Sequence, residues 1–110
     1  MAERERRRDR DEGRILVEER VKPKKPRMYG VVLLNDDYTP MEFVVWVLRV
    51  VFHKGQAEAT RLMLDVHNKG KGLCGVFTYD VARTKAQQVE NLAAKQDYPL
   101  KCELEAVETE

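Results

Sequence analysis

The chain has 110 residues, 35% of them charged, and a formal net charge of +1. This length corresponds to one small domain that can bury a modest core without disulfides or metals. The longest apolar run, residues 43–52, is interrupted by Arg49 and has only about half the length that a membrane-spanning helix needs. We therefore expect a single domain that does not enter a membrane.

Charge is distributed unevenly between the two parts of the chain. Residues 1–27 contain eleven Lys or Arg and seven Asp or Glu, which gives +4, whereas residues 28–110 contain nine and twelve, which gives −3. The first part has too little apolar surface to offset the entropy of ordering it. We expect residues 1–27 to be a disordered tail that ends in a Pro-containing linker, residues 28–106 to form the domain, and residues 107–110 to fray.

The acidic residues of this tail argue against several functions of basic segments. A secretory signal requires an uninterrupted apolar region, and a transit peptide is poor in acidic residues. Nucleic-acid binding is not expected either, because the interleaved acids weaken the positive field and no aromatic side chain offers a stacking surface. Cys74 and Cys102 lack metal-ligand spacing and are expected to be reduced, packed thiols. These features predict a cytosolic protein.

The domain is predicted to begin with a strand, a loop and a helix. Residues 29–34 are mostly β-branched or aliphatic, which is typical of a strand, and the loop NDDY follows. The sequence TPME places Thr39 and Glu42 as a capping box around Pro40. It predicts a helix that runs to about His53. Because this helix is apolar on nearly all sides, we expect it to be buried on more than one side.

The second half of the domain adds two helices and two strands. Residues 56–68 have apolar side chains at helical spacing, and Gly70 closes this helix. Residues 73–78 are a strand, and Thr78 is the expected cap of a third helix that reaches about Lys95. Residues 100–105 alternate between apolar and charged, as in a strand with one wet face. The order β-α-α-β-α-β predicts an α+β domain, a three-stranded antiparallel sheet with three helices packed on it.

The loop residues Asn35, Asp36 and Asp37 allow two interpretations. They are common in turns, and negative charge is favoured near a helix start, so they could serve the fold alone. From the spacing alone, this interpretation is as well supported as a binding role. The chain has no nucleophile with a base at motif spacing, no HExxH and no Gly-rich phosphate loop. We therefore expect no catalysis, no cofactor and no metal.

Three stretches together resemble one protein family. They are YGVVLLNDDYTPMEFVVWVL, ATRLMLDVHNKGKGLCGVFTYDVARTKA and YPLKCELE. In this order they resemble the ClpS family of ATP-dependent Clp protease adaptors, over residues 28–105. The resemblance implies an adaptor that binds the free α-amino group and the bulky first residue (Leu, Phe, Tyr or Trp) of N-degron substrates. It also implies delivery to a AAA+ unfoldase through the N-terminal domain of ClpA or ClpC, for which a monomer suffices.

The resemblance also implies a role for individual residues. Asn35, Asp37 and His67 would surround the amine. Asp36 is assigned to the same amine-binding site, where it would shape the turn or set the field rather than touch the amine. The hydrophobic pocket would be lined by Thr39, Met41, Val44, Met63, Val66 and Leu100, with Met41 as the gatekeeper that rejects Ile and Val. Asp80 and Lys85 would contact the unfoldase, although spacing alone favours a helix-capping acid and a solvated lysine.

The same residues have plainer default interpretations, and one rival function remains open. By spacing alone, His67 is a satisfied histidine on an amphipathic helix, and Met41 and Met63 are core filler. The C-terminal domain of the ribosomal stalk protein has a similar fold, so a structural or interaction domain without amine binding is the alternative function. That alternative has no use for Asn35, Asp37 and His67 acting together.

Overall fold

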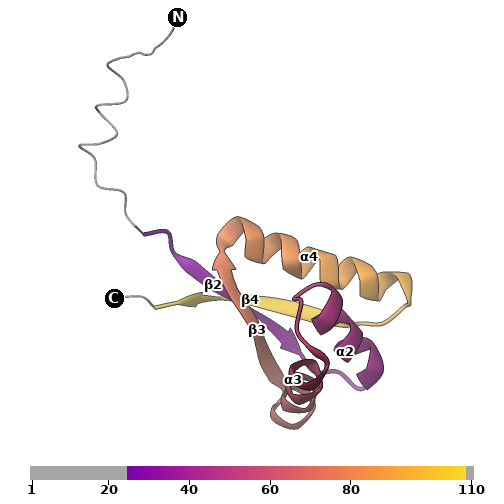
Figure 1. Cartoon of the computed structure of the whole chain (residues 1–110). Helices are drawn as coiled ribbons and strands as arrows, with labels where there is room; N and C mark the ends of the chain where they lie inside the picture. Colours follow the sequence, from indigo (N-terminus) through magenta and orange to yellow (C-terminus); the bar gives the residue numbers. More distant parts are fainter. Residues whose placement is uncertain (1–24, 109–110) are drawn as a thin grey trace, which may run out of the picture.

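The computed structural model describes residues 25–108 of the chain. Six elements follow the predicted order (Figure 1). They are β2 (Met28–Leu34), α2 (Met41–Val50), α3 (Gln56–Lys69), β3 (Lys71–Thr78), α4 (Tyr79–Lys95) and β4 (Lys101–Val107). Most of the predicted tail, residues 1–24, lies outside the described residues, as do residues 109–110. Strand β4 extends to Val107, one residue into the segment predicted to fray.

The three strands form an antiparallel sheet, as predicted, and their order in it is β3-β2-β4. At the end of the central strand, Leu34 pairs with Lys71 on one side and with Lys101 on the other. The register between β2 and β3 shifts between Val31 and Val32. The loop that follows β2 therefore leaves the sheet beside the first residues of both neighbouring strands.

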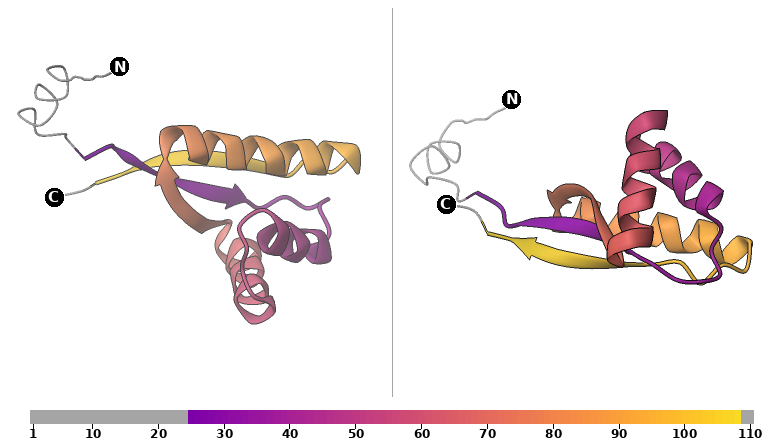
Figure 2. Two further views of the ribbon diagram at one scale, coloured as in Figure 1. Left: turned by 45° about the horizontal axis from the view of Figure 1, so that its top comes forward. Right: turned by 90° about the horizontal axis from the view of Figure 1, so that it is seen from below.

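The core lies between the three helices and one face of this sheet. Val31 and Leu33, which alternate along β2, point toward that face and are fully buried. Their helical neighbours in the core are Val44, Val47 and Leu48 of α2, Ala59, Met63 and Val66 of α3, and Ala82, Val89 and Ala93 of α4. Figure 2 shows α4 along the sheet, whereas α2 and α3 lie together near the end of β2. This arrangement places the β2–α2 loop next to the α2–α3 pair.

The start of α2 differs from the prediction. Pro40 is the N-cap residue, the helix begins at Met41, and no side chain caps its N-terminus. The predicted capping box is wrong, because the N-cap lies one residue after Thr39 and no side chain accepts a hydrogen bond from the first turn. The Thr39 hydroxyl instead donates to Oδ2 of Asp36 at 2.7 Å. Asp36 also accepts a hydrogen bond from the Thr39 amide, so Thr39 belongs to the preceding turn and not to the helix cap.

The outer side of α2 and its C-terminus also differ from the prediction. Trp46 and Val50 are 45% and 47% exposed, so burial on more than one side is not observed for this helix. The helix ends at Val50 because the chain turns at His53, which adopts a left-handed φ of 58°. The amide of Lys54 then donates to the carbonyl oxygen of Leu48 at 3.1 Å, which satisfies one of the last helical carbonyls.

The two cysteines are free thiols in the domain interior. Cys74 is 2% exposed, and Cys102 is partly buried. Burial raises the pKa of each thiol to about 12, because an apolar environment disfavours the charged thiolate. Both groups are therefore protonated at neutral pH and are weak nucleophiles.

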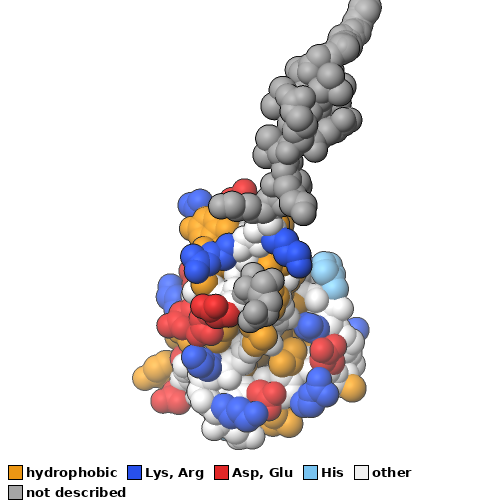
Figure 3. All heavy atoms as spheres, turned by 90° about the vertical axis from the view of Figure 1, so that its left-hand side faces the viewer, with side chains coloured by type: hydrophobic (Ala, Val, Ile, Leu, Met, Phe, Trp, Pro, Cys, Tyr) orange, Lys and Arg blue, Asp and Glu red, His pale blue; other side chains and the backbone are white. Residues whose placement is uncertain are grey.

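The described surface carries charges of both signs. On the face shown in Figure 3, basic and acidic side chains are interspersed with hydrophobic ones. Among residues 25–108, no helix has the length and apolar character that crossing a bilayer requires.

Candidate functional site

The start of the β2–α2 loop is tied to the end of α3. The amide of Asn35 donates to the carbonyl oxygen of Gly70 at 2.9 Å. Gly70 has a φ of 91°, a conformation that glycine adopts without steric cost, and it closes α3 as predicted. Its own amide donates to the carbonyl oxygen of Val66 at 3.0 Å. This connection brings the last turn of α3, which carries His67, beside Asn35.

The middle of the loop is organised by the carboxylate of Asp36. Oδ1 accepts hydrogen bonds from the amides of Tyr38 and Thr39, both at 2.7 Å. Oδ2 accepts the hydroxyl of Thr39, also at 2.7 Å. Short Asp side chains form such bonds to the backbone two or three residues further on. Asp36 therefore shapes the turn, which is one of the two roles expected for it.

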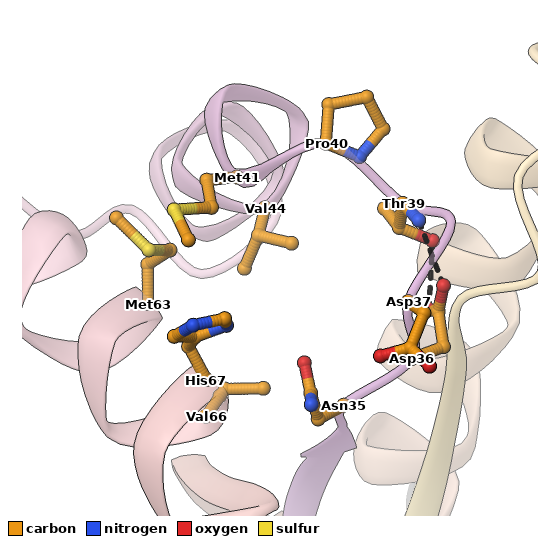
Figure 4. A pocket seen from close by; sticks show the side chains of 10 residues that line it. All are labelled: Asn35, Asp36, Asp37, Thr39, Pro40, Met41, Val44, Met63, Val66 and His67. Atoms are coloured by element: carbon orange, nitrogen blue, oxygen red, sulfur yellow. Dashed lines mark hydrogen bonds between the residues drawn. The ribbon is translucent and has the colours of Figure 1, made fainter.

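A cavity of about 280 Å³ lies between this loop, α2 and α3 (Figure 4). It is lined by Asn35, Asp36, Asp37, Thr39, Pro40, Met41, Val44, Met63, Val66 and His67. The structure thus brings together nine of the ten residues predicted for the amine site and the hydrophobic pocket. Cavities for drug-sized ligands begin at about 300 Å³. This volume therefore suits a small group such as one amino-acid side chain.

The polar wall of the cavity is rich in acceptors. The side-chain oxygen of Asn35 points into the cavity, and the ring of His67 lies across from it (Figure 4). Asn35, Asp37 and His67 are all exposed. None of these three side chains forms a hydrogen bond or ion pair with another residue of the segment 25–108. Their polar groups are therefore available to a ligand.

The field at this wall is negative. Asp36 and Asp37 contribute two carboxylates. His67 lies in the last turn of α3, where the unpaired helix carbonyls carry the negative end of the helix dipole. A cation is therefore favoured at this end of the cavity.

The apolar wall consists of side chains from α2 and α3. Val44 and Val66 are buried, and Met63 is 9% exposed. Met41 is 46% exposed and lies near Met63 at the side of the cavity away from the acidic loop (Figure 4). Methionine side chains are flexible and polarisable, so they can adapt to ligands of different shape.

Two residues at the cavity differ from the sequence prediction. Leu100 does not line the cavity, because it is 2% exposed and packed in the core just before β4. Pro40 lines it and was not predicted. Pro40 lies between two predicted lining residues, Thr39 and Met41, and this position in the sequence could have identified it as a lining residue.

The two residues predicted to contact an unfoldase lie on α4, outside the cavity. Asp80 is exposed in the first turn of this helix. Lys85 is not the solvated lysine that spacing favoured. Its Nζ donates to the carbonyl oxygen of Val51 at 2.8 Å and lies 5.8 Å from the centroid of the Phe77 ring. Lys85 therefore connects α4 to the end of α2, a contact that no local pattern could reveal.

Comparison with known proteins identifies the family. Residues 24–103 match the family model described as ATP-dependent Clp protease adaptor protein ClpS. This chain belongs to the ClpS family. The ClpS adapter of Acetivibrio thermocellus is 61% identical over 82 residues, which cover 74% of this chain and 83% of the relative. The ClpS adapter of Parvibaculum lavamentivorans is 50% identical over 108 residues, which cover 96% and 98%.

A solved ClpS structure has the same fold. Agrobacterium tumefaciens ClpS2 bound to L-phenylalaninamide matches with a TM-score of 0.74 and 38% sequence identity. The match covers 76% of this chain and all of that one. It confirms the predicted α+β fold, and the family assignment makes the chain an adapter of the Clp protease.

Proposed function

We propose that this ClpS-family adapter binds the free α-amine and bulky first residue (Leu, Phe, Tyr or Trp) of N-degron proteins and delivers them to a AAA+ unfoldase. The observation that carries the proposal is the cavity, in which a negative wall with free acceptors adjoins a pocket sized for one side chain. The relative bound to L-phenylalaninamide supports it. That ligand combines a free α-amine, a benzyl side chain and an amide at the position of the next peptide bond.

The polar wall suits an α-ammonium group. This group has a pKa near 8, so it is mostly charged at neutral pH and offers three N–H donors. Asn35 and Asp37 provide oxygen acceptors, and His67 provides an imidazole nitrogen, which acts directly or through a water. Each charge-assisted hydrogen bond contributes about 1.5 to 3 kcal/mol. Acetylation of the amine removes both the charge and two of the donors, so a blocked N-terminus should not bind.

The apolar wall suits the first side chain. Burying one large apolar side chain contributes about 1.5 to 3 kcal/mol. With the amine contacts, this supports binding in the micromolar range or tighter after the cost of association. By the family resemblance, Met41 limits the pocket to side chains that are unbranched at Cβ.

Delivery requires a surface that is free while the cavity is occupied. The exposed first turn of α4 around Asp80 lies outside the cavity lining and meets this condition. We assign docking on the N-terminal domain of ClpA or ClpC to this turn. Lys85 contributes by holding α4 against α2 through the Val51 carbonyl.

The convergence of Asn35, Asp37 and His67 on one cavity favours this function over the stalk-like alternative, which gives these residues no role. A degradation assay tests it. A reporter protein that begins with Phe is incubated with a Clp unfoldase, its peptidase and ATP, with and without this chain, beside the same reporter that begins with Gly. Faster degradation of the Phe reporter alone is expected, and equal rates with and without the chain would contradict the proposal.

A further inference from the structure

We propose that Asp36 is a positioning residue, which sets the orientation of Asn35 and Asp37 and does not bind the amine itself. This inference rests on the proposed function and deepens it. The three adjacent polar residues of the loop then have two different roles. The two outer residues contact the ligand, and the middle one fixes the turn that presents them.

The hydrogen bonds of Asp36 support this division. Its two oxygens accept three hydrogen bonds from the loop itself, from the amides of Tyr38 and Thr39 and from the hydroxyl of Thr39. The two amide bonds are 2.7 Å long, whereas ordinary N–H···O bonds are about 2.9 to 3.0 Å long. The hydroxyl bond, also 2.7 Å, has the ordinary length of an O–H···O bond. Of roughly four acceptor sites on a carboxylate, three are therefore used within the loop. Neither Asn35 nor Asp37 has any such side-chain bond within residues 25–108.

The loop depends on this carboxylate because its other hydrogen bonds lie at its ends. The amide of Asn35 holds the start to Gly70, and the amide of Phe43 holds the exit to Pro40. Among the described residues, the only hydrogen bonds made by residues 36–39 are those to the Asp36 carboxylate. Without these bonds the loop would lose its fixed geometry. The entropy cost of ordering the loop on binding would then reduce the affinity for a ligand.

A conservative and a truncating substitution separate geometry from charge. Asp36→Asn retains an oxygen that accepts from the two amides and an amino group that can donate to the Thr39 hydroxyl. Asp36→Ala removes all three bonds. A positioning role predicts that the Asn variant keeps most of the affinity and that the Ala variant loses it by about tenfold or more. A residue that contacts the ammonium through its charge should lose affinity in both variants.

Asp37 offers a matched comparison within the same loop. As a direct ligand without loop hydrogen bonds, it should lose affinity in both Asp37→Asn and Asp37→Ala. A small loss in Asp36→Asn that comes only from the weaker field should disappear when the salt concentration rises from about 0.15 to 0.5 M, because salt screens exposed charges. Thr39→Val removes only the hydroxyl, so its effect should vanish in the Asp36→Ala background if the two residues act together.

The test measures binding and loop order separately on the full chain. Fluorescence anisotropy gives the affinity of each variant for a labelled Phe-initiated peptide, with an N-acetylated peptide as reference, and thermal unfolding verifies the fold. Amide hydrogen exchange by NMR gives the protection of Tyr38 and Thr39 without any ligand. Protection in the original chain and in Asp36→Asn, with its loss in Asp36→Ala, is expected together with the affinity pattern above.

The outcomes distinguish this inference from the proposed function. Equal losses of affinity in Asp36→Asn and Asp36→Ala would overturn the positioning role and leave amine binding intact. Unprotected Tyr38 and Thr39 amides in the original chain would also overturn it. If the original chain binds free and acetylated peptides equally, the proposed function fails, while the exchange data still decide whether Asp36 orders the loop.

Discussion

Replacing Asp37 should reduce affinity for an N-degron peptide without loss of stability. Its side chain is exposed and has no hydrogen bond within residues 25–108, so its removal leaves no protein group unpaired. Exposed substitutions of this kind change the free energy of unfolding by roughly 0.5 kcal/mol or less. Asp37→Ala removes a charge-assisted bond worth about 1.5 to 3 kcal/mol, which corresponds to roughly a 10- to 150-fold increase in Kd. Asp37→Asn keeps a neutral acceptor and should cost roughly tenfold.

The assay is a fluorescence anisotropy titration with a labelled peptide that begins with Phe, at pH 7. Asp97→Asn is the matched control, since Asp97 is exposed, lies outside the cavity lining and has a left-handed φ of 62° that Asn tolerates. The control should bind like the original chain, and the thermal midpoints of all variants should agree within a few degrees. An unchanged Kd for Asp37→Ala would refute the assignment of this carboxylate to the amine.

Three further outcomes are expected. Met41→Ala should admit peptides that begin with Ile or Val, and continued rejection in the same titration would show that Met41 is not the gatekeeper. Lys85→Met leaves the Val51 carbonyl without this hydrogen-bond donor, so the free energy of unfolding measured in urea should fall by about 1 to 3 kcal/mol. An unchanged urea midpoint of unfolding would contradict the role of this contact. Burial raises the pKa of Cys74 and Cys102 from 9.0 to about 12, so the stability that neutral thiols contribute should be complete below pH 9 and decline between pH 9 and 12. That decline should be shallower in Cys74→Ala, and identical slopes would argue against this origin.

Local sequence patterns were sufficient to predict the order and type of the elements. Alternation in residues 100–105 predicted β4, and helical spacing with a closing Gly70 predicted α3. These signals depend on neighbouring residues that take part in the same element, so they can be read without the fold. The element boundaries were less accurate because competing interactions determine them.

The capping box shows how a local motif can place a helix boundary wrongly. Thr39, Pro40, Met41 and Glu42 satisfy the pattern, yet the Thr39 hydroxyl binds Asp36 in the structure. The motif considers only the residues that follow the cap, whereas the carboxylate that holds Thr39 lies three residues before it. Thr39 therefore belongs to the turn around Asp36, and the N-cap lies one residue later than the motif predicts.

The composition of the candidate site was predictable only through the family resemblance. Spacing alone supported a turn role and a binding role equally for Asn35 and Asp37, and it left His67 as an ordinary helix residue. These residues meet because Asn35 is hydrogen-bonded to Gly70, one turn beyond His67, and no local pattern contains that contact. Leu100 was misassigned for a similar reason, since burial in the core depends on packing that the sequence does not display.

The central claim is that this cavity recognises a free N-terminal amine together with a bulky first side chain. The most direct measurement is the anisotropy of a labelled peptide that begins with Phe, compared with the same peptide carrying an N-acetyl group. Binding of the free peptide alone is the predicted result. Binding of both peptides, or of neither, would contradict the claim and would leave Asn35 and Asp37 with a role in the turn alone.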